Sequence, residues 1–178
     1  MPWLDKIFGG AKNMAALQPG TKAPDISLAA LDGTTFSLQD ALKKGPVVAA
    51  FFKVSCPVCQ YAFPYFERVY KAHAGESVTF VAISQDDRPN TTSFLKQYGV
   101  TFSTLLDDPK GYAVSNAYGL TNVPTLFLIG QDGEIEISSV GWVRKDVEDL
   151  HRRLAELQKT PPPQLFKPGE EVRDFRAG

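Results

Sequence analysis

The apolar run GPVVAAFFKV, residues 45–54, constrains the fold of this chain more than any other segment. It carries no polar side chain before Lys53, so an extended strand here has no face suited to water, which is typical of a strand buried on both faces. A second, mainly apolar run, SVTFVAIS, follows at 77–84. Two such strands joined by a helix form a βαβ unit with a parallel pair and a right-handed crossover. The two runs therefore predict an α/β domain with a buried sheet.

The segment between these two strands has the periodicity of an amphipathic helix. Its apolar residues follow the spacing i, i+3, i+4, i+7, i+8, i+11 and i+12, and they are Val58, Tyr61, Ala62, Tyr65, Phe66, Val69 and Tyr70. This spacing places them on one face of a helix that ends near Gly75. We expect most of the aromatic surface of this helix to lie in the core, and the sequence leaves open whether Phe63 is an exposed docking residue.

The remaining elements are predicted from turn signals and periodicity. Asp32-Gly33 between two short apolar stretches predicts a β-hairpin within residues 26–38. The sequence Asp107-Asp108-Pro109 could be taken for a pair of functional acids, but we interpret it first as the capping signal of a helix that runs to Gly119. The other elements expected along the chain are a helix over 90–99, a strand at 103–106, two strands about a turn at 131–133, and an amphipathic helix over 144–159.

The chain divides into three parts by its composition. Residues 1–22 form an N-terminal extension, 23–159 the main domain and 160–178 a proline-rich tail, and 178 residues are enough for one ordinary domain. In the extension we expect a short amphipathic helix with Trp3, Leu4, Ile7 and Phe8 on one side. The extended tail is expected to dock through Leu165, Phe166 and Phe175.

Charge and hydropathy exclude two classes of partner. Nineteen basic and twenty acidic residues give a net charge of −1, which offers no basic field for nucleic acid. No apolar segment approaches the length of a membrane span, and the N-terminal stretch lacks the apolar core of a signal peptide. We therefore expect a cytoplasmic protein; the alternative is a periplasmic or secreted protein from which a leader has been removed.

The only two cysteines, Cys56 and Cys59, lie in the sequence KVSCPVCQ where the first buried strand gives way to the helix. Two cysteines three positions apart on the first helical turn share a face and are close enough for a disulfide. The helix N-terminus favours the thiolate of the first cysteine. Cys56 is therefore the expected attacking thiol and Cys59 the resolving thiol, and Pro57 fits the first turn.

Three other interpretations of the cysteine pair carry less weight. Structural zinc needs four ligands, and after His73 the second histidine of a finger-like pattern is missing. A structural disulfide closing so small a loop restricts the unfolded chain little. Two buried thiols acting as small apolar side chains remain the plainest alternative. We interpret His73 and His151 as surface groups and expect no metal.

Several separated features together resemble the thioredoxin fold over most of residues 23–157. They are the strand VVAAFFKV before CPVC, Pro64 inside the following helix, the segment NVPTLFLI, and then QDGEI, Gly141 and a terminal helix. The chain is similar to the branch that holds the TlpA/ResA-like oxidoreductases and the AhpC/TSA (redoxin) proteins. The resemblance implies an α/β thioredoxin fold with an N-terminal β-hairpin extension, an extra strand-helix insertion, and a central mixed sheet flanked by helices. It also implies a cis Val123–Pro124 bond packed against the cysteines, with Val123 pairing to extended substrates.

The activity implied by this resemblance is thiol-disulfide exchange without a cofactor. Its partners would be protein or small-molecule disulfides and a thiol electron donor; the sequence does not give the oligomeric state. One alternative is a peroxiredoxin-like peroxidase, whose Pro-x-x-x-Thr/Ser-x-x-Cys pattern fails at both cysteines: the matching pairs are Ala49 with Lys53 and Phe52 with Cys56. The other is a non-catalytic binding module, which the intact CxxC disfavours.

The residues around the cysteines depart from the thioredoxin pattern at two positions. Ser55 stands where thioredoxins usually carry Trp, and Ala50 stands where many carry a buried acid. Proton transfer at Cys59 must therefore use another group or water. Lys53 is a candidate for stabilising the Cys56 thiolate, although a lysine at a strand end is more often solvated. Pro57 and Val58, between the cysteines, are expected to tune the reduction potential.

Overall fold

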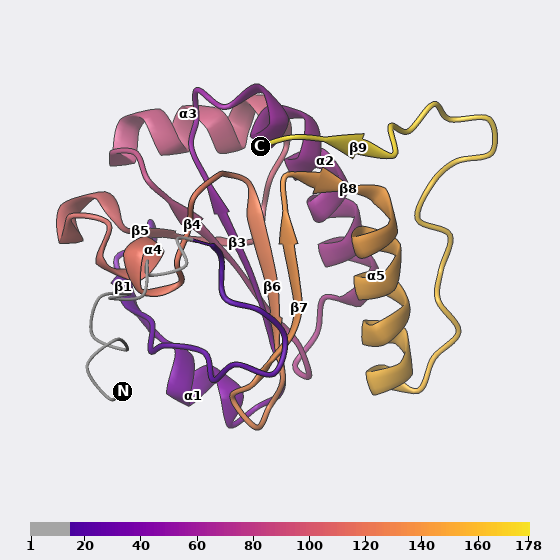
Figure 1. The fold of residues 1–178 in the computed structure, drawn as a ribbon, viewed down its shortest axis with the longest axis horizontal. Coiled ribbons are helices and arrows are strands. Elements are labelled where there is room, and N and C mark those ends of the chain that lie inside the picture. Colours follow the sequence, from indigo (N-terminus) through magenta and orange to yellow (C-terminus); the bar gives the residue numbers. More distant parts are fainter. Residues whose placement is uncertain (1–14) are drawn as a thin grey trace, which may run out of the picture.

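The computed structural model describes residues 15–178, and its centre is a five-stranded mixed sheet with the order β5-β4-β3-β6-β7 (Figure 1). The helix expected around Trp3, Leu4, Ile7 and Phe8 lies outside the described residues. Strand β3 (Val47–Phe52) is central, parallel to β4 (Thr79–Ser84) and antiparallel to β6 (Thr125–Ile129). All six residues of β3 are buried. The predicted βαβ unit and the doubly buried strand are confirmed.

Alternating side chains of β3 belong to two cores. Val48, Ala50 and Phe52 face the core covered by α2 (Pro57–His73), α3 (Arg88–Tyr98) and α5 (Arg144–Gln158). The intervening residues face a second core, which is covered by β1 (Ser27–Ala29), α1 (Leu38–Leu42) and α4 (Ala113–Ala117). Helices therefore cover both faces of the sheet, as its apolar strands require.

The outer strands agree closely with the predicted positions. Strand β5 (Ser103–Leu106) pairs parallel with β4, and β7 (Ile135–Val140) pairs antiparallel with β6. The predicted hairpin is β1 paired with β2 (Thr35–Ser37). Helix α1 was not predicted, because the sequence analysis placed its first residue at the end of the hairpin. The Ser37 hydroxyl caps it by accepting a hydrogen bond from the Asp40 N–H at 3.3 Å.

The single helix predicted from Asp108 to Gly119 is wrong. The chain instead forms a 3₁₀ turn at Asp108–Lys110 and then the short α4, because Gly111 and Tyr112 between them both have left-handed backbones. The predicted capping signal is wrong as well, since Asp107 makes no side-chain capping hydrogen bond at the 3₁₀ turn. Its buried carboxylate accepts the N–H groups of Val114 and Ser115 at 3.2 and 2.7 Å, at the start of α4.

His73 and His151 are not surface groups, and their predicted exposure is wrong. Their exposed fractions are 2% and 6%, and His73 Nε2 lies 2.9 Å from His151 Nδ1. The Oε1 atom of Gln158 binds His73 Nδ1 at 2.7 Å, and the Pro163 carbonyl binds His151 Nε2 at 2.5 Å. These hydrogen bonds join α2, α5 and the tail, and they satisfy the polar atoms of both buried rings.

The tail crosses α5 and α2 in an extended form (Figure 1). Leu165 and Phe166 pack partly buried against the core, as expected, and Val172 does the same. Phe175 does not dock, since it is 63% exposed. It belongs instead to strand β9 (Phe175–Arg176), which pairs antiparallel with β8 (Trp142–Val143). Side chains alternate along a strand, so Arg176 and not Phe175 points toward α2.

The aromatic core of α2 yields a first prediction. Phe63 is fully buried, with its ring 4.5 Å from that of Phe52 and 5.6 Å from that of Phe94, so it is no docking residue. We expect Phe63→Ala to lower the free energy of unfolding by about 3–5 kcal/mol, because it leaves a cavity. Chemical denaturation of the reduced protein measures this. Phe175→Ala is the control and should cost less than about 0.5 kcal/mol. Similar values for the two variants would contradict this packing.

The histidine pair yields a prediction on pH. Burial lowers the pKa of His73 below its ordinary value of 6.5, and the charge of His151 adds to this, while the hydrogen bond to Gln158 opposes it. The unfolded chain therefore binds more protons than the folded chain, and the free energy of unfolding should fall as the pH drops below 6.5. Denaturation of Cys56→Ser protein at pH 5.5–7.5 measures this slope without the thiol. Adding His73→Gln should flatten it, and an unchanged slope would exclude His73 as its source.

Candidate active site

The cysteine pair lies where β3 delivers the chain to the N-terminus of α2. Cys56 is the N-cap residue, with φ −82° and ψ 114°, and Pro57 takes the first helical position, as predicted. The Cys56 N–H donates to the Lys53 carbonyl at 3.1 Å, which turns the chain between strand and helix. The Cys56 sulfur accepts a hydrogen bond from the Cys59 N–H at 3.2 Å. The first helical turn therefore holds Cys56 by its own backbone.

A second segment reaches the same sulfur from the start of β6. The Val123–Pro124 peptide bond is cis, as the resemblance implied. When it is protonated, the Cys56 thiol donates to the Val123 carbonyl at 3.3 Å, and the Gly141 N–H donates to the Pro124 carbonyl at 2.8 Å. Pro124 is buried, whereas Val123 is half-buried. The loop predicted to hold substrate thus lies beside the predicted attacking thiol.

The two thiols have opposite electrostatic surroundings. The hydrogen bond with Cys59, the N–H groups of Cys59 and Val58, and the charge of Arg176 lower the pKa of Cys56 to about 6, against the opposing effect of burial. Cys59 is completely buried, and this desolvation, together with Cys56 itself, raises the pKa of its thiol far above the ordinary value. At neutral pH the pair therefore consists of a half-exposed thiolate and a buried thiol, both in the reduced state.

The other residues predicted to contribute to the site lie beside the cysteines, before or within the first helical turn. Lys53, Ser55 and Pro57 are exposed, and Val58 is buried under the first helical turn. The charge that contributes to the low pKa of Cys56 is that of Arg176, and the candidate Lys53 lies exposed, as is more usual for a lysine at a strand end. No sequence signal pointed to Arg176, because it lies 120 residues from Cys56 and reaches the site only through the fold of the tail.

A carboxylate that the sequence analysis missed also belongs to the site. The Asp86 carboxylate accepts the Val54 N–H at 2.7 Å, and its negative charge is one of the influences that raise the pKa of Cys59. Asp86 follows β4, and the carboxyl ends of the parallel strands β3 and β4 meet at one edge of the sheet. That shared edge was the available signal. Ala50, where many thioredoxins carry an acid, is buried in β3.

The zinc interpretation gains no support from the site. Within residues 15–178 the structure contains no group of three or more His, Cys, Asp or Glu side chains placed to hold a metal ion. One ring nitrogen of His73 is hydrogen-bonded to Gln158 and the other to His151.

Within residues 15–178, no helix is long and apolar enough to cross a bilayer.

A five-stranded mixed sheet, a CxxC at a helix N-terminus and a cis-proline loop define a thioredoxin-fold thiol protein. Comparison with known proteins agrees: the sequence model of the Redoxin family matches residues 18–154. The chain belongs to the Redoxin family. Its predicted membership of the thioredoxin-like superfamily and its predicted fold class are both confirmed.

Individual relatives narrow the activity. The thiol-disulfide oxidoreductase ResA of Bacillus subtilis (strain 168) is 31% identical over 165 residues, covering 92% of this chain and 83% of its own. ResA of Geobacillus thermodenitrificans (strain NG80-2) is 30% identical, with 80% of each chain covered. A thiol:disulfide interchange protein of the thioredoxin family from Chlorobium tepidum TLS has a similar structure, with a TM-score of 0.63 at 29% identity, over 80% of this chain and 98% of its own. The protein is a thiol-disulfide oxidoreductase.

The low pKa of Cys56 can be tested by alkylation. The rate of reaction of the reduced protein with iodoacetamide should follow the thiolate fraction, with a midpoint near pH 6 in place of the ordinary value of 9.0. One equivalent should react, because Cys59 is buried and protonated. Mass spectrometry of the labelled peptides and a stopped-flow pH series measure both. A midpoint above about pH 8, or equal labelling of Cys59, would contradict the assigned asymmetry.

Proposed function

We propose that the Cys56 thiolate attacks a disulfide of a protein or small molecule and that Cys59 completes the reaction. The observation that supports these roles is the asymmetry of the pair: Cys56 is half-exposed with a pKa of about 6, and Cys59 is fully buried with a raised pKa. The nucleophile in exchange is the thiolate, so the cysteine that is both accessible and ionised attacks first.

The reaction proceeds in two exchanges. In the first, Cys56 Sγ bonds to one substrate sulfur and the other substrate sulfur leaves as a thiolate, which gives a mixed disulfide. In the second, Cys59 releases its proton to water and its thiolate attacks Cys56 Sγ. The bond between Cys56 and the substrate breaks, the remaining substrate sulfur leaves as a thiolate that can take up a proton from water, and the Cys56–Cys59 disulfide forms. Two electrons pass from the pair to the substrate. A thiol donor returns them, and the reverse order oxidises a dithiol substrate.

The surroundings support each exchange. The Val123 carbonyl, 3.3 Å from Cys56 Sγ, belongs to a half-buried backbone edge where an extended substrate would pair. Asp86 is the carboxylate whose charge raises the pKa of Cys59. We assign it the role of keeping the Cys59 thiol protonated until the mixed disulfide has formed. No metal or organic cofactor is needed for these steps.

The assigned roles can be tested by trapping the intermediate. With a disulfide-bonded peptide, Cys59→Ser should accumulate a covalent mixed disulfide at Cys56, whereas Cys56→Ser should form none, because its remaining thiol is buried. Intact-mass spectrometry under acid quench counts the adducts. For the unmodified protein, equilibration with glutathione and dithiothreitol buffers should give a two-electron midpoint between about −120 and −270 mV.

Two results would overturn the proposal. The first is an adduct on Cys59 in the Cys56→Ser variant, which would reverse the roles. The second is the failure of the pair to form an intramolecular disulfide in any buffer. In that case, consumption of hydrogen peroxide with a thiol reductant would identify a peroxidase instead.

A further inference from the structure

Residues 165–178, named here the strap, contact α2 through Arg68, Tyr65 and Tyr61, and their last part returns past α5 as β9 (Figure 1). Near its beginning an ion pair attaches the strap to α2. The Arg68 guanidinium contacts both carboxylate oxygens of Glu170, at 2.7 and 2.8 Å. Phe166 adds an aromatic contact, with its ring 5.7 Å from that of Tyr65. This half of the strap is fixed to the side of the active-site helix.

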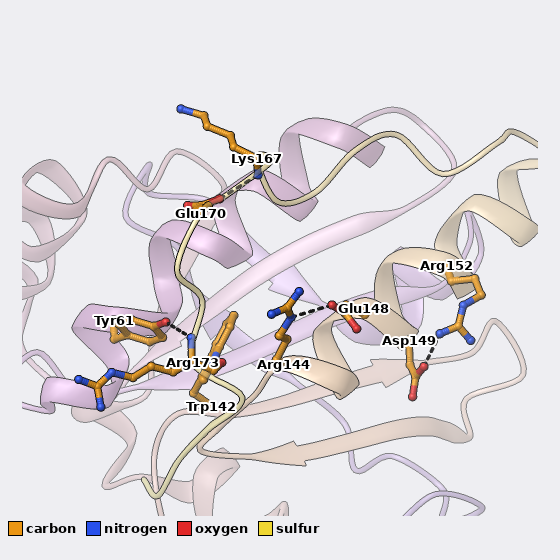
Figure 2. Close-up of polar contacts among 9 residues, drawn as sticks. All are labelled: Tyr61, Trp142, Arg144, Glu148, Asp149, Arg152, Lys167, Glu170 and Arg173. Carbon is orange, nitrogen blue, oxygen red and sulfur yellow. Dashed lines mark hydrogen bonds and ion pairs between the residues drawn. The ribbon is translucent and has the colours of Figure 1, made fainter.

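The middle of the strap is held by hydrogen bonds to two aromatic side chains. Figure 2 shows the Arg173 N–H donating to the Tyr61 hydroxyl, at 2.9 Å. The indole N–H of Trp142 donates to the Arg173 carbonyl at 2.5 Å, and the Arg144 N–H donates to the Asp174 carbonyl at 2.9 Å. Tyr61 lies two residues beyond Cys59 on α2, so these contacts direct the strap toward the site.

The last part of the strap lies against the cis-proline loop. Asn122 Nδ2 donates to the Gly178 carbonyl at 2.9 Å, and the Arg176 guanidinium lies over the Tyr61 ring at 5.1 Å. The backbones touch so closely that a Cβ atom on Gly178 would lie 2.6 Å from the Val123 carbonyl oxygen. This is the same oxygen that accepts the Cys56 thiol at 3.3 Å. The strap therefore occupies the edge of Val123, while Cys56 itself stays half-exposed.

We propose that the strap determines which disulfides reach Cys56, because it competes with polypeptide substrates for the backbone edge of Val123. Small disulfides need only the half-exposed sulfur and react with the strap in place. A polypeptide that pairs with Val123 has to displace residues 174–178 first. This inference rests on the proposed function of Cys56 and Val123. It adds that the strap selects between small and polypeptide disulfides at that site.

The structure shows where the strap would open. Strands β8 and β9 share only two residue pairs, Trp142 with Arg176 and Val143 with Phe175, and Phe175 is 63% exposed. Trp142 is buried, but a ladder of two residue pairs has few hydrogen bonds to break, and such short ladders are among the first to open in native proteins. The Arg68–Glu170 ion pair and the contacts of Phe166 lie before this ladder. Residues 174–178 can therefore lift while the strap stays attached to α2.

The test uses the full chain with Gly178→Ala and Gly178→Trp, whose new side chains cannot fit against Val123. Gly75→Ala is the matched control, because a Cβ there meets no atom within 4 Å. Exchange rates are measured with oxidised glutathione and with an unstructured peptide dimer joined by one disulfide. We expect the ratio of the peptide rate to the glutathione rate to rise about tenfold in both Gly178 variants, because the competent fraction increases. It should stay unchanged in the control.

The possible outcomes separate this inference from the proposed function. An unchanged ratio in both Gly178 variants overturns the inference, and so does an equal rise with both substrates, since the strap would then act on Cys56 itself. A lower ratio also overturns it, because the strap would then be part of the peptide site. If the unmodified protein exchanges with neither disulfide, the proposed function fails.

Discussion

The burial of β3 on both faces is the constraint on which the rest of the structure depends. A strand with no solvent-exposed face needs a neighbouring strand on each edge and a covered core on each face. The neighbours of β3 are β4 and β6, and its two faces lie in two separate cores. It also fixes the site, because the cysteines follow directly where this strand ends. The adjacent strands bring their own loops to the same end: Asp86 after β4, and the cis-proline loop before the antiparallel β6.

The chemistry of the site comes from a gradient of burial across one helical turn. Cys56, as the N-cap residue, meets backbone N–H groups and partial solvent, and Cys59 lies one turn deeper in the core. Identical side chains therefore acquire opposite pKa shifts. Ala50 stands where many thioredoxins carry a buried acid, and the carboxylate whose charge acts on Cys59 here is Asp86, in the loop after β4.

The parts of this structure that the sequence predicted are those governed by local patterns. Strands such as β3 and β5, the helix α2 and the place of the cysteine pair at its N-terminus follow from runs, periods and spacings of a few residues. The parts it missed depend on contacts between distant segments. His73 and His151 are polar residues on helices, and only the packing of α2 against α5 and Pro163 buries them. Arg176 acts on Cys56 for the same reason, through the pairing of β8 with β9.

Helix α2 connects these long-range features because the tail contacts it directly at Arg68 and Tyr61, and through His151 of α5 at His73. At its C-terminal end, His73 binds His151, which in turn binds the Pro163 carbonyl where the tail begins. In its middle, Arg68 binds Glu170, and nearest the cysteines Tyr61 binds the backbone of Arg173. A segment held at two points on α2 and at a third on α5 keeps its path even when its last residues separate from β8. The anchoring thereby limits any opening to the part beside Val123, which is where a substrate chain would bind.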